Sequence, residues 1–194
     1  MPSCTAPIYL NIPPVSLVCV KALEVVGHKN SGKTTLVEYF VERFTRDGFR
    51  VAAVKHIHHS FTIDTENKDT WRMSRRGAWL VASVSPNETA VMFHGRSGWE
   101  QSLGRLMRIM DEEEVDVAVF EGFHMLLGGR EDVHKIITVK ESQDLEYFLN
   151  TLKPPVIAVV DISGRLVSKT PVPCFKSPLS EDLYLLARRE LGLV

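Results

Sequence analysis

The sequence predicts an α/β fold in three layers, with a mostly parallel sheet, helices on both faces and an antiparallel addition. Short apolar runs that are typical of buried strands alternate along the chain with longer segments of helical periodicity. A glycine-rich segment, residues 27–34, stands between the first predicted strand and the first predicted helix. Most of the conspicuous polar residues fall where predicted strands end, which is the edge where parallel sheets bind ligands.

Each element is predicted from the period of its apolar residues, about two for a strand and 3.6 for a helix. Gly48 follows the first helical pattern, as expected of a helix end. Pro86 and Asn87 form a short turn between two neighbouring strands, which makes that pair antiparallel. We expect Trp71, Trp79 and Trp99 to pack in the core or against helices. The predicted strands are 16–26, 50–56, 79–85, 87–95, 115–123, 135–140 and 155–161, and the predicted helices are 32–48, 67–78, 99–114, 144–152 and 180–191.

Length and composition favour one globular domain. The 194 residues are 44% apolar, and we expect a loose arm over residues 1–15 followed by a single domain over residues 16–194. The formal net charge of −1 argues against a nucleic-acid partner, and no apolar run reaches the length of a membrane-spanning helix. The three cysteines are far apart in the sequence, which favours a reducing cytoplasmic location over a disulfide framework.

The glycine-rich segment fits the phosphate-loop pattern G-x-x-x-x-G-K-[ST] at every fixed position. Its glycines let the backbone curl so that successive N–H groups and the helix N-terminus face an anion. We expect Lys33 to reach the β- and γ-phosphates, Thr34 to bind Mg²⁺, and Thr35 to contact the α-phosphate. The predicted nucleotide-binding residues are Gly27, His28, Lys29, Asn30, Ser31, Gly32, Lys33, Thr34 and Thr35.

A nucleotide site also needs a carboxylate near the Mg²⁺ ion. Glu121 ends an apolar strand that we expect beside the first strand, so it is the main candidate. Asp64 is a further candidate for the metal, because the chain returns there from the second strand. Asp161 ends another strand, where it could meet a base or a metal, or simply begin a turn.

The second strand ends in a histidine-rich segment that allows three interpretations. The histidines could bind zinc or nickel, they could form an anion-binding wall with nearby cations, or the segment could be a solvated loop. The candidates for the anion-binding wall are Lys55, His56, His58, His59, Lys68 and Arg72.

Three blocks of the sequence resemble the molybdopterin-guanine dinucleotide biosynthesis protein B (MobB) family. They are "GHKNSGKTTL", "KHIHHSFTIDTENKDTWRMSRRGA" and "VDVAVFEGF" followed by "HKI". The middle block is the specific one, because a phosphate loop alone points to a very large superfamily. The chain departs from the family pattern at Asn67, His124 and His134, where Gly, Lys and Pro are common.

The resemblance implies a P-loop NTPase fold of the dimerising branch that includes several metallochaperone GTPases. It implies a homodimer that binds GTP with Mg²⁺ and hydrolyses it weakly, whereas the cytoplasmic location and the absence of a membrane partner are expected from the cysteines and the composition. It also implies that the protein assists the molybdopterin guanylyltransferase, which joins GMP to molybdopterin.

The residues themselves leave the base and the activity open. No Asn-Lys-x-Asp motif for guanine is present, so GTP follows from the resemblance alone. Two other functions compete: a nickel or zinc metallochaperone GTPase, suggested by the histidines, and a small-molecule kinase, suggested by the arginines at positions 72, 75 and 76.

Overall fold

The computed structural model describes residues 20–59, 61–95, 98–164 and 170–193. The predicted arm over residues 1–15, and the beginning of the first predicted strand, lie outside the described residues. The described residues form two compact units, one made of those from Val20 to Lys55 and from Gly104 onward, and the other of those within His56–Leu103.

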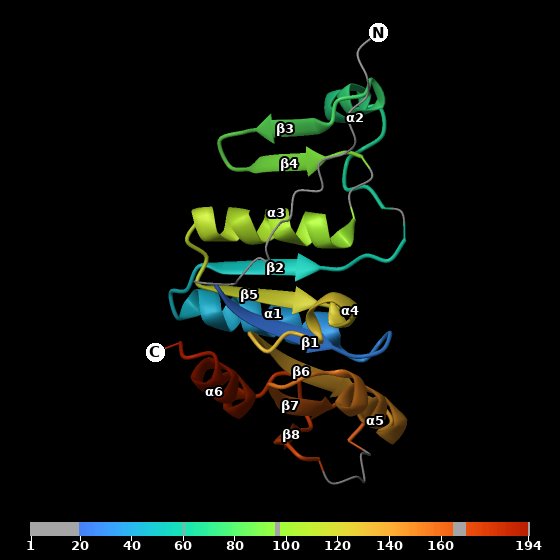
Figure 1. Cartoon of the computed structure of the whole chain (residues 1–194). Coiled ribbons are helices and arrows are strands. Elements are labelled where there is room, and N and C mark those ends of the chain that lie inside the picture. Colours follow the sequence, from blue (N-terminus) through green and yellow to red (C-terminus); the bar gives the residue numbers. More distant parts are fainter. Residues whose placement is uncertain (1–19, 60, 96–97, 165–169, 194) are drawn as a thin grey trace, which may run out of the picture. The chain divides into compact units, whose positions relative to one another are not determined.

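The larger unit is built on a six-stranded sheet in which all neighbouring described strands are parallel. The strand order is β2-β5-β1-β6-β7-β8, so the first strand of the chain lies in the interior of the sheet (Figure 1). Because all strands run the same way, their carboxyl ends meet at one edge. The bounds are β1 Lys21–Val26, β2 Val51–Lys55, β5 Val117–Glu121, β6 Val133–Val139, β7 Val156–Asp161 and β8 Cys174–Phe175.

Helices cover both faces of this sheet, which confirms the predicted fold class. One face packs against α1 and α6, and the other against α4 and α5. The helix α3 begins in the smaller unit and ends in the larger one. The bounds are α1 Lys33–Arg46, α3 Trp99–Glu112, α4 His124–Leu127, α5 Ser142–Thr151 and α6 Glu181–Glu190.

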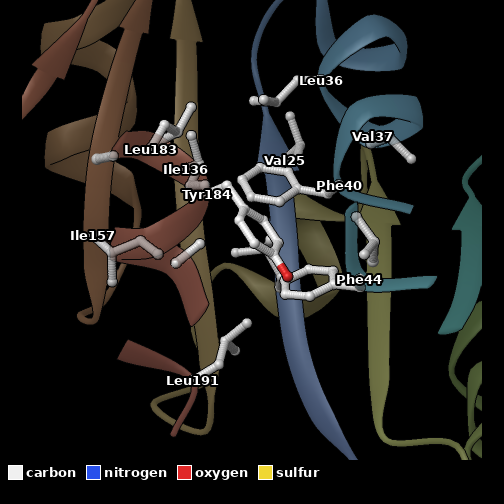
Figure 2. Close-up of a cluster of buried hydrophobic side chains, with 14 of the residues drawn as sticks. Val25, Leu36, Val37, Phe40, Phe44, Ile136, Ile157, Leu183, Tyr184 and Leu191 are labelled. Carbon is white, nitrogen blue, oxygen red and sulfur yellow. The ribbon is translucent and has the colours of Figure 1, made fainter. Parts of the chain in front are cut away.

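The main core lies between the sheet and the pair α1 and α6. Phe40 and Phe44 of α1 are fully buried one helical turn apart, and Tyr184 of α6 packs against both rings (Figure 2). Leu23 and Val25 of β1 belong to the same cluster, which therefore fixes the strand and the helix that flank the phosphate loop.

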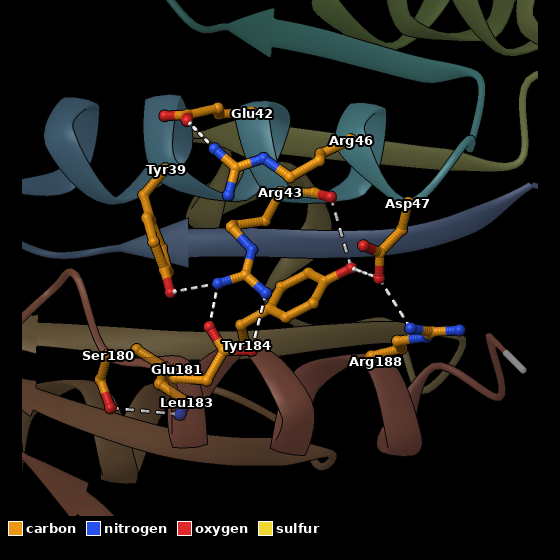
Figure 3. A network of polar contacts seen from close by, with 10 residues as sticks. All are labelled: Tyr39, Glu42, Arg43, Arg46, Asp47, Ser180, Glu181, Leu183, Tyr184 and Arg188. Atoms are coloured by element: carbon orange, nitrogen blue, oxygen red, sulfur yellow. Dashed lines mark hydrogen bonds and ion pairs between the residues drawn. The ribbon is translucent and has the colours of Figure 1, made fainter.

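A polar network closes this core at its rim. The Tyr184 hydroxyl and the Arg188 guanidinium both donate to Asp47 Oδ2, each at 2.6 Å (Figure 3). Arg43 of α1 forms a bidentate ion pair with Glu181 of α6. Burial of the Tyr184 phenol and its hydrogen bond to Asp47 both raise the pKa of this side chain. These contacts hold α6 against α1 where the apolar packing ends.

The smaller unit contains a helix, α2 (Asp69–Arg75), and an antiparallel pair, β3 (Leu80–Val84) and β4 (Thr89–Phe93). This pair is the predicted antiparallel addition. Trp79 and Trp99 are 56% and 55% exposed, so neither lies in the core, which was one of the two predicted places; their rings pack against Phe93 and His56. No described helix is long and apolar enough to cross a membrane.

A carboxylate lies inside the central strand of the sheet. Glu24 is fully buried, and its register partner on β6 is Lys135, which is also fully buried. The Lys135 ammonium donates to the carbonyl oxygens of Arg130, Lys153 and Pro154. Burial raises the pKa of Glu24 from 4.5 to about 8, although the charge of Lys135 opposes this shift.

The raised pKa makes folding stability depend on pH. Between about pH 5 and pH 8 the folded state holds a proton on Glu24 that the unfolded state has released. Stability relative to a Glu24→Gln variant should therefore fall as the pH rises through this window, by about 1.4 kcal/mol per pH unit. Urea unfolding of both proteins at several pH values measures the difference.

The exposed glutamate Glu146 provides a matched control. A Glu146→Gln variant should keep the pH dependence of the wild-type protein. If the curves of the wild-type protein and the Glu24→Gln variant run parallel from pH 5 to pH 8, Glu24 does not carry the extra proton.

Candidate functional site

The phosphate loop connects β1 to α1, as the sequence predicted. Lys33 is the first residue of α1, and Gly32 precedes it in the left-handed region with φ 76°. Asn30 also has a positive φ, 61°, a conformation that asparagine tolerates better than most residues. The loop closes on itself through a hydrogen bond of 3.3 Å from the Ser31 amide to the His28 carbonyl.

Gly27 is required because the loop passes directly over β6. A Cβ atom at this position would lie 2.2 Å from Thr138 Oγ1 and 2.4 Å from Ser31 Oγ. Those two hydroxyls are hydrogen-bonded at 2.6 Å, and Thr138 also donates to the Val26 carbonyl at 3.1 Å. Thr138, which the sequence did not single out, therefore anchors the buried side of the loop.

The side chain of Lys33 folds back over the phosphate loop. Its ammonium donates to the His28 carbonyl oxygen at 2.7 Å. Partial burial lowers the pKa of Lys33, the carboxylate of Glu121 opposes that shift, and the charge of Lys55 adds to it. The side chain thus places a positive charge where an incoming phosphate would meet the loop.

A carboxylate and a hydroxyl meet beside the loop at the carboxyl edge of the sheet. Thr34 Oγ1 donates to Glu121, at 3.0 Å from Oε1 and 3.1 Å from Oε2. The strand register explains this meeting, because Glu121 at the end of β5 pairs with Val25 of β1, just before the loop. Glu121 is only 8% exposed, so its charge requires a cation nearby.

Lys55 supplies that cation in the structure. Its ammonium lies 3.0 Å from Glu121 Oε1 and 3.3 Å from Thr34 Oγ1, and Lys55 is the register partner of Glu121 on β2. The sequence grouped Lys55 with the histidines in an anion-binding wall, whereas the structure pairs it with the predicted metal residues.

The oxygens of Thr34 and Glu121 fit a magnesium ion by their chemistry. Both are hard oxygen donors, which Mg²⁺ prefers, and Glu121 brings the negative charge that the ion requires. Asp64, the third predicted metal residue, belongs to the other unit, where it accepts a hydrogen bond of 2.8 Å from Thr70. Its role at the metal stays a prediction.

The histidine segment lies in the smaller unit. The His56 ring contacts the rings of His58 and Trp99, with centroids 4.2 Å and 4.5 Å away. His58 and His59 are exposed, as are Lys68 and Arg72 of the α2 region. Among the described residues, no three His, Cys, Asp or Glu side chains are grouped so that they could hold a metal ion.

Asp161, the other acid at a strand end, begins a turn. Its Oδ1 accepts hydrogen bonds from the Ser163 amide, the Ser163 hydroxyl and the Gly164 amide, at 2.7 to 3.0 Å. This is the turn that an aspartate at such a position commonly forms. The neighbouring Ile162 packs 3.3 Å from the Cβ position that Gly32 lacks, so β7 also borders the phosphate loop.

Comparisons with known proteins agree with this geometry. A family model described as molybdopterin guanine dinucleotide synthesis protein B (MobB) matches residues 22–162. A molybdopterin-guanine dinucleotide biosynthesis adapter protein of Haemophilus influenzae is 33% identical over 104 residues, which cover 54% of this chain and 57% of that protein. The adapter protein of Escherichia coli is 26% identical over 122 residues, which cover 63% of this chain and 67% of that protein.

Solved structures show the same fold. The crystal structure of Bacillus subtilis MobB matches 85% of this chain and 96% of its own, with a TM-score of 0.65 and 26% identity. A MobB homologue from Bacillus stearothermophilus matches 90% of this chain and the whole of its own, with a TM-score of 0.67 and 21% identity.

The chain spans 57% and 48% of the length of the curated relatives from H. influenzae and Methanocaldococcus jannaschii. The family model, however, covers well over half of the 194 residues, including the phosphate loop, Glu121 and the histidine segment. The protein therefore belongs to the molybdopterin guanine dinucleotide synthesis protein B family.

Proposed function

We propose that the protein binds GTP with Mg²⁺ in the cytoplasm and acts as an adapter in molybdenum cofactor biosynthesis. In this role it assists the guanylyltransferase that attaches GMP to molybdopterin. The observation that carries nucleotide binding is the meeting of Thr34, Glu121 and Lys33 around the loop at one edge of the sheet. The adapter role is supported by the names of the relatives in H. influenzae and E. coli.

Different residues of the site would bind the phosphates and the Mg²⁺ ion of a nucleotide. The amides of the phosphate loop and the N-terminus of α1 would hold the phosphate oxygens, since no side chain competes for them at Gly27 and Gly32. Lys33 would exchange part of its contact with the His28 carbonyl for the β- and γ-phosphates. Thr34 and Glu121 would hold the Mg²⁺ ion, which neutralises phosphate charge when it is bound.

Hydrolysis should be slow. The sequence shows no glutamine placed to orient water and no arginine finger, and the described contacts of the site add neither. A protein of this kind acts through its bound state, so we propose at most a weak GTPase activity.

We further propose that polar side chains of the smaller unit bind an anionic partner or substrate, molybdopterin among them. His58, His59, Lys68 and Arg72 are exposed, and Arg72 lies 3.4 Å from Asp69. Exposed N–H donors of this kind suit phosphate groups.

The β3–β4 pair supports the proposed homodimer. One face of it carries Leu80, Val84, Val91 and Phe93, which are 40 to 81% exposed. Among the described strands, β3 and β4 pair only with each other. An isolated two-stranded sheet with an apolar face is stable only when another surface covers it, and a second copy of the chain offers the same face.

Replacing Lys33 tests nucleotide binding. A Lys33→Ala variant should bind Mg²⁺–GTP about 100-fold more weakly, because it loses charge-assisted hydrogen bonds to two phosphates. Isothermal titration calorimetry measures the affinity. Lys21→Ala, at the opposite end of β1, should bind like the wild-type protein. Equal affinities of the Lys33→Ala and wild-type proteins would exclude the loop as the site.

A guanylation assay tests the adapter role. The guanylyltransferase should form molybdopterin guanine dinucleotide faster when the wild-type protein and Mg²⁺–GTP are added. The expected increase is about several-fold, as for an activating partner. Lys33→Ala should give no increase. Tight GTP binding by the wild-type protein without any change in guanylation would sink the adapter role and leave nucleotide binding intact.

A charge on the apolar face of β4 tests the homodimer. The wild-type protein should sediment as a dimer, and Val91→Glu should sediment as a monomer because the interface would bury an unpaired carboxylate. Ser83→Glu points to the other face of the pair and should stay dimeric. A monomeric wild-type protein at micromolar concentration contradicts the proposal.

A further inference from the structure

His28 occupies a position in the phosphate loop that its motif leaves open to any residue. Its carbonyl oxygen accepts two hydrogen bonds, one from the Lys33 ammonium at 2.7 Å and one from the Ser31 amide at 3.3 Å. The orientation of the His28 peptide therefore decides where the Lys33 amine rests and whether the loop is closed.

The His28 side chain is held by α5, a helix far from the loop in sequence. Its Nε2 atom lies 3.4 Å from Asp144 Oδ1. Its ring also packs against Phe148 and Tyr147, with centroids 5.1 Å and 5.7 Å away. The His28 side chain thus contacts three residues on one face of α5, which are Asp144, Tyr147 and Phe148.

Those partners are themselves fixed in place. Asp144 Oδ2 accepts the amides of Lys140 and Glu141 at 3.4 Å, as part of the capping box that begins α5 directly after β6. Phe148 is 1% exposed and belongs to a second apolar cluster, on the face of the sheet that α5 covers. The ring of His124 from α4 also packs against Phe148. His28 therefore contacts a rigid surface rather than a mobile loop.

We propose that His28 is a positioning residue for the nucleotide phosphates and that Asp144 is its partner. The contact with Asp144 restrains the imidazole, the imidazole restrains its own peptide, and the peptide carbonyl holds Lys33 ready for the β- and γ-phosphates. The inference rests on the proposed binding of a nucleoside triphosphate and adds two residues to it. Neither residue needs to touch the nucleotide.

Substitutions of His28 separate this role from simple packing. His28→Leu keeps an apolar side chain against Phe148 and loses the contact with Asp144, so it should bind Mg²⁺–GTP about tenfold more weakly. His28→Gln places an amide nitrogen near the position of Nε2 and should bind within about twofold of the wild-type protein. Calorimetry gives the affinities, and thermal melting without nucleotide should give the same midpoint for all three proteins.

Substitutions of Asp144 test the partner. Asp144→Ala should weaken binding about as much as His28→Leu, and the double variant should be no weaker than either, because one contact is lost in all three. Glu141→Ala removes only the other half of the helix cap, the acceptor of the Asp144 amide, and should bind normally. Weak binding by Glu141→Ala would assign the effect to the cap and overturn the role of the Asp144 contact.

The outcomes distinguish the two levels of the proposal. If the wild-type protein binds no Mg²⁺–nucleotide, nucleotide binding itself fails, and the role of His28 fails with it. If the wild-type protein binds and His28→Leu binds equally well, only the positioning role is overturned. A His28→Leu variant that also melts early, without rescue by His28→Gln, shows a structural role alone and overturns the inference.

Discussion

The close approach of the loop to β6 is the constraint on which the site depends. At Gly27 the backbone passes so near Thr138 that no side chain fits, and the Ser31 and Thr138 hydroxyls close the gap with a hydrogen bond of 2.6 Å. These contacts hold the loop close to the sheet at its carboxyl edge. The parallel register then places Glu121 and Lys55 beside it, because β5 lies between β1 and β2. The charges of the site follow from the order of the strands.

The core explains why this edge keeps its geometry. Phe40, Phe44 and Tyr184 tie α1 to α6, and Leu23 and Val25 tie β1 to the same cluster. The loop therefore connects β1 and α1, which pack into the same core. The second face contributes through α5, whose Asp144 and Phe148 contact the loop from its other end. Helices on both faces of the sheet thus help to fix the position of the phosphate loop.

Much of this fold was accessible from the sequence, because periodicity and spacing are local properties. The long elements and the phosphate loop were predicted, whereas α4 and β8 were not, since four and two residues are too short for any period to show. Glu121 was found because it ends an apolar run. The contacts of Thr138 and Asp144 with the loop were not predicted, because they join distant parts of the chain. The contact of Lys55 with Glu121 was not predicted, since it depends on the order of the strands, and the anion-binding role of Lys55 stays a prediction.

The buried Glu24 and Lys135 pair restricts how this sheet can diverge. Loss of Lys135 alone would leave three carbonyl oxygens and a carboxyl group in the interior without their cation, while loss of Glu24 alone would leave the ammonium without its acidic neighbour. Joint replacement by two apolar side chains of similar volume removes the buried ammonium and the buried carboxyl group together at little cost. A substitution at either position alone should therefore destabilise the sheet, unless a change in the loops around Arg130 and Lys153 compensates for it.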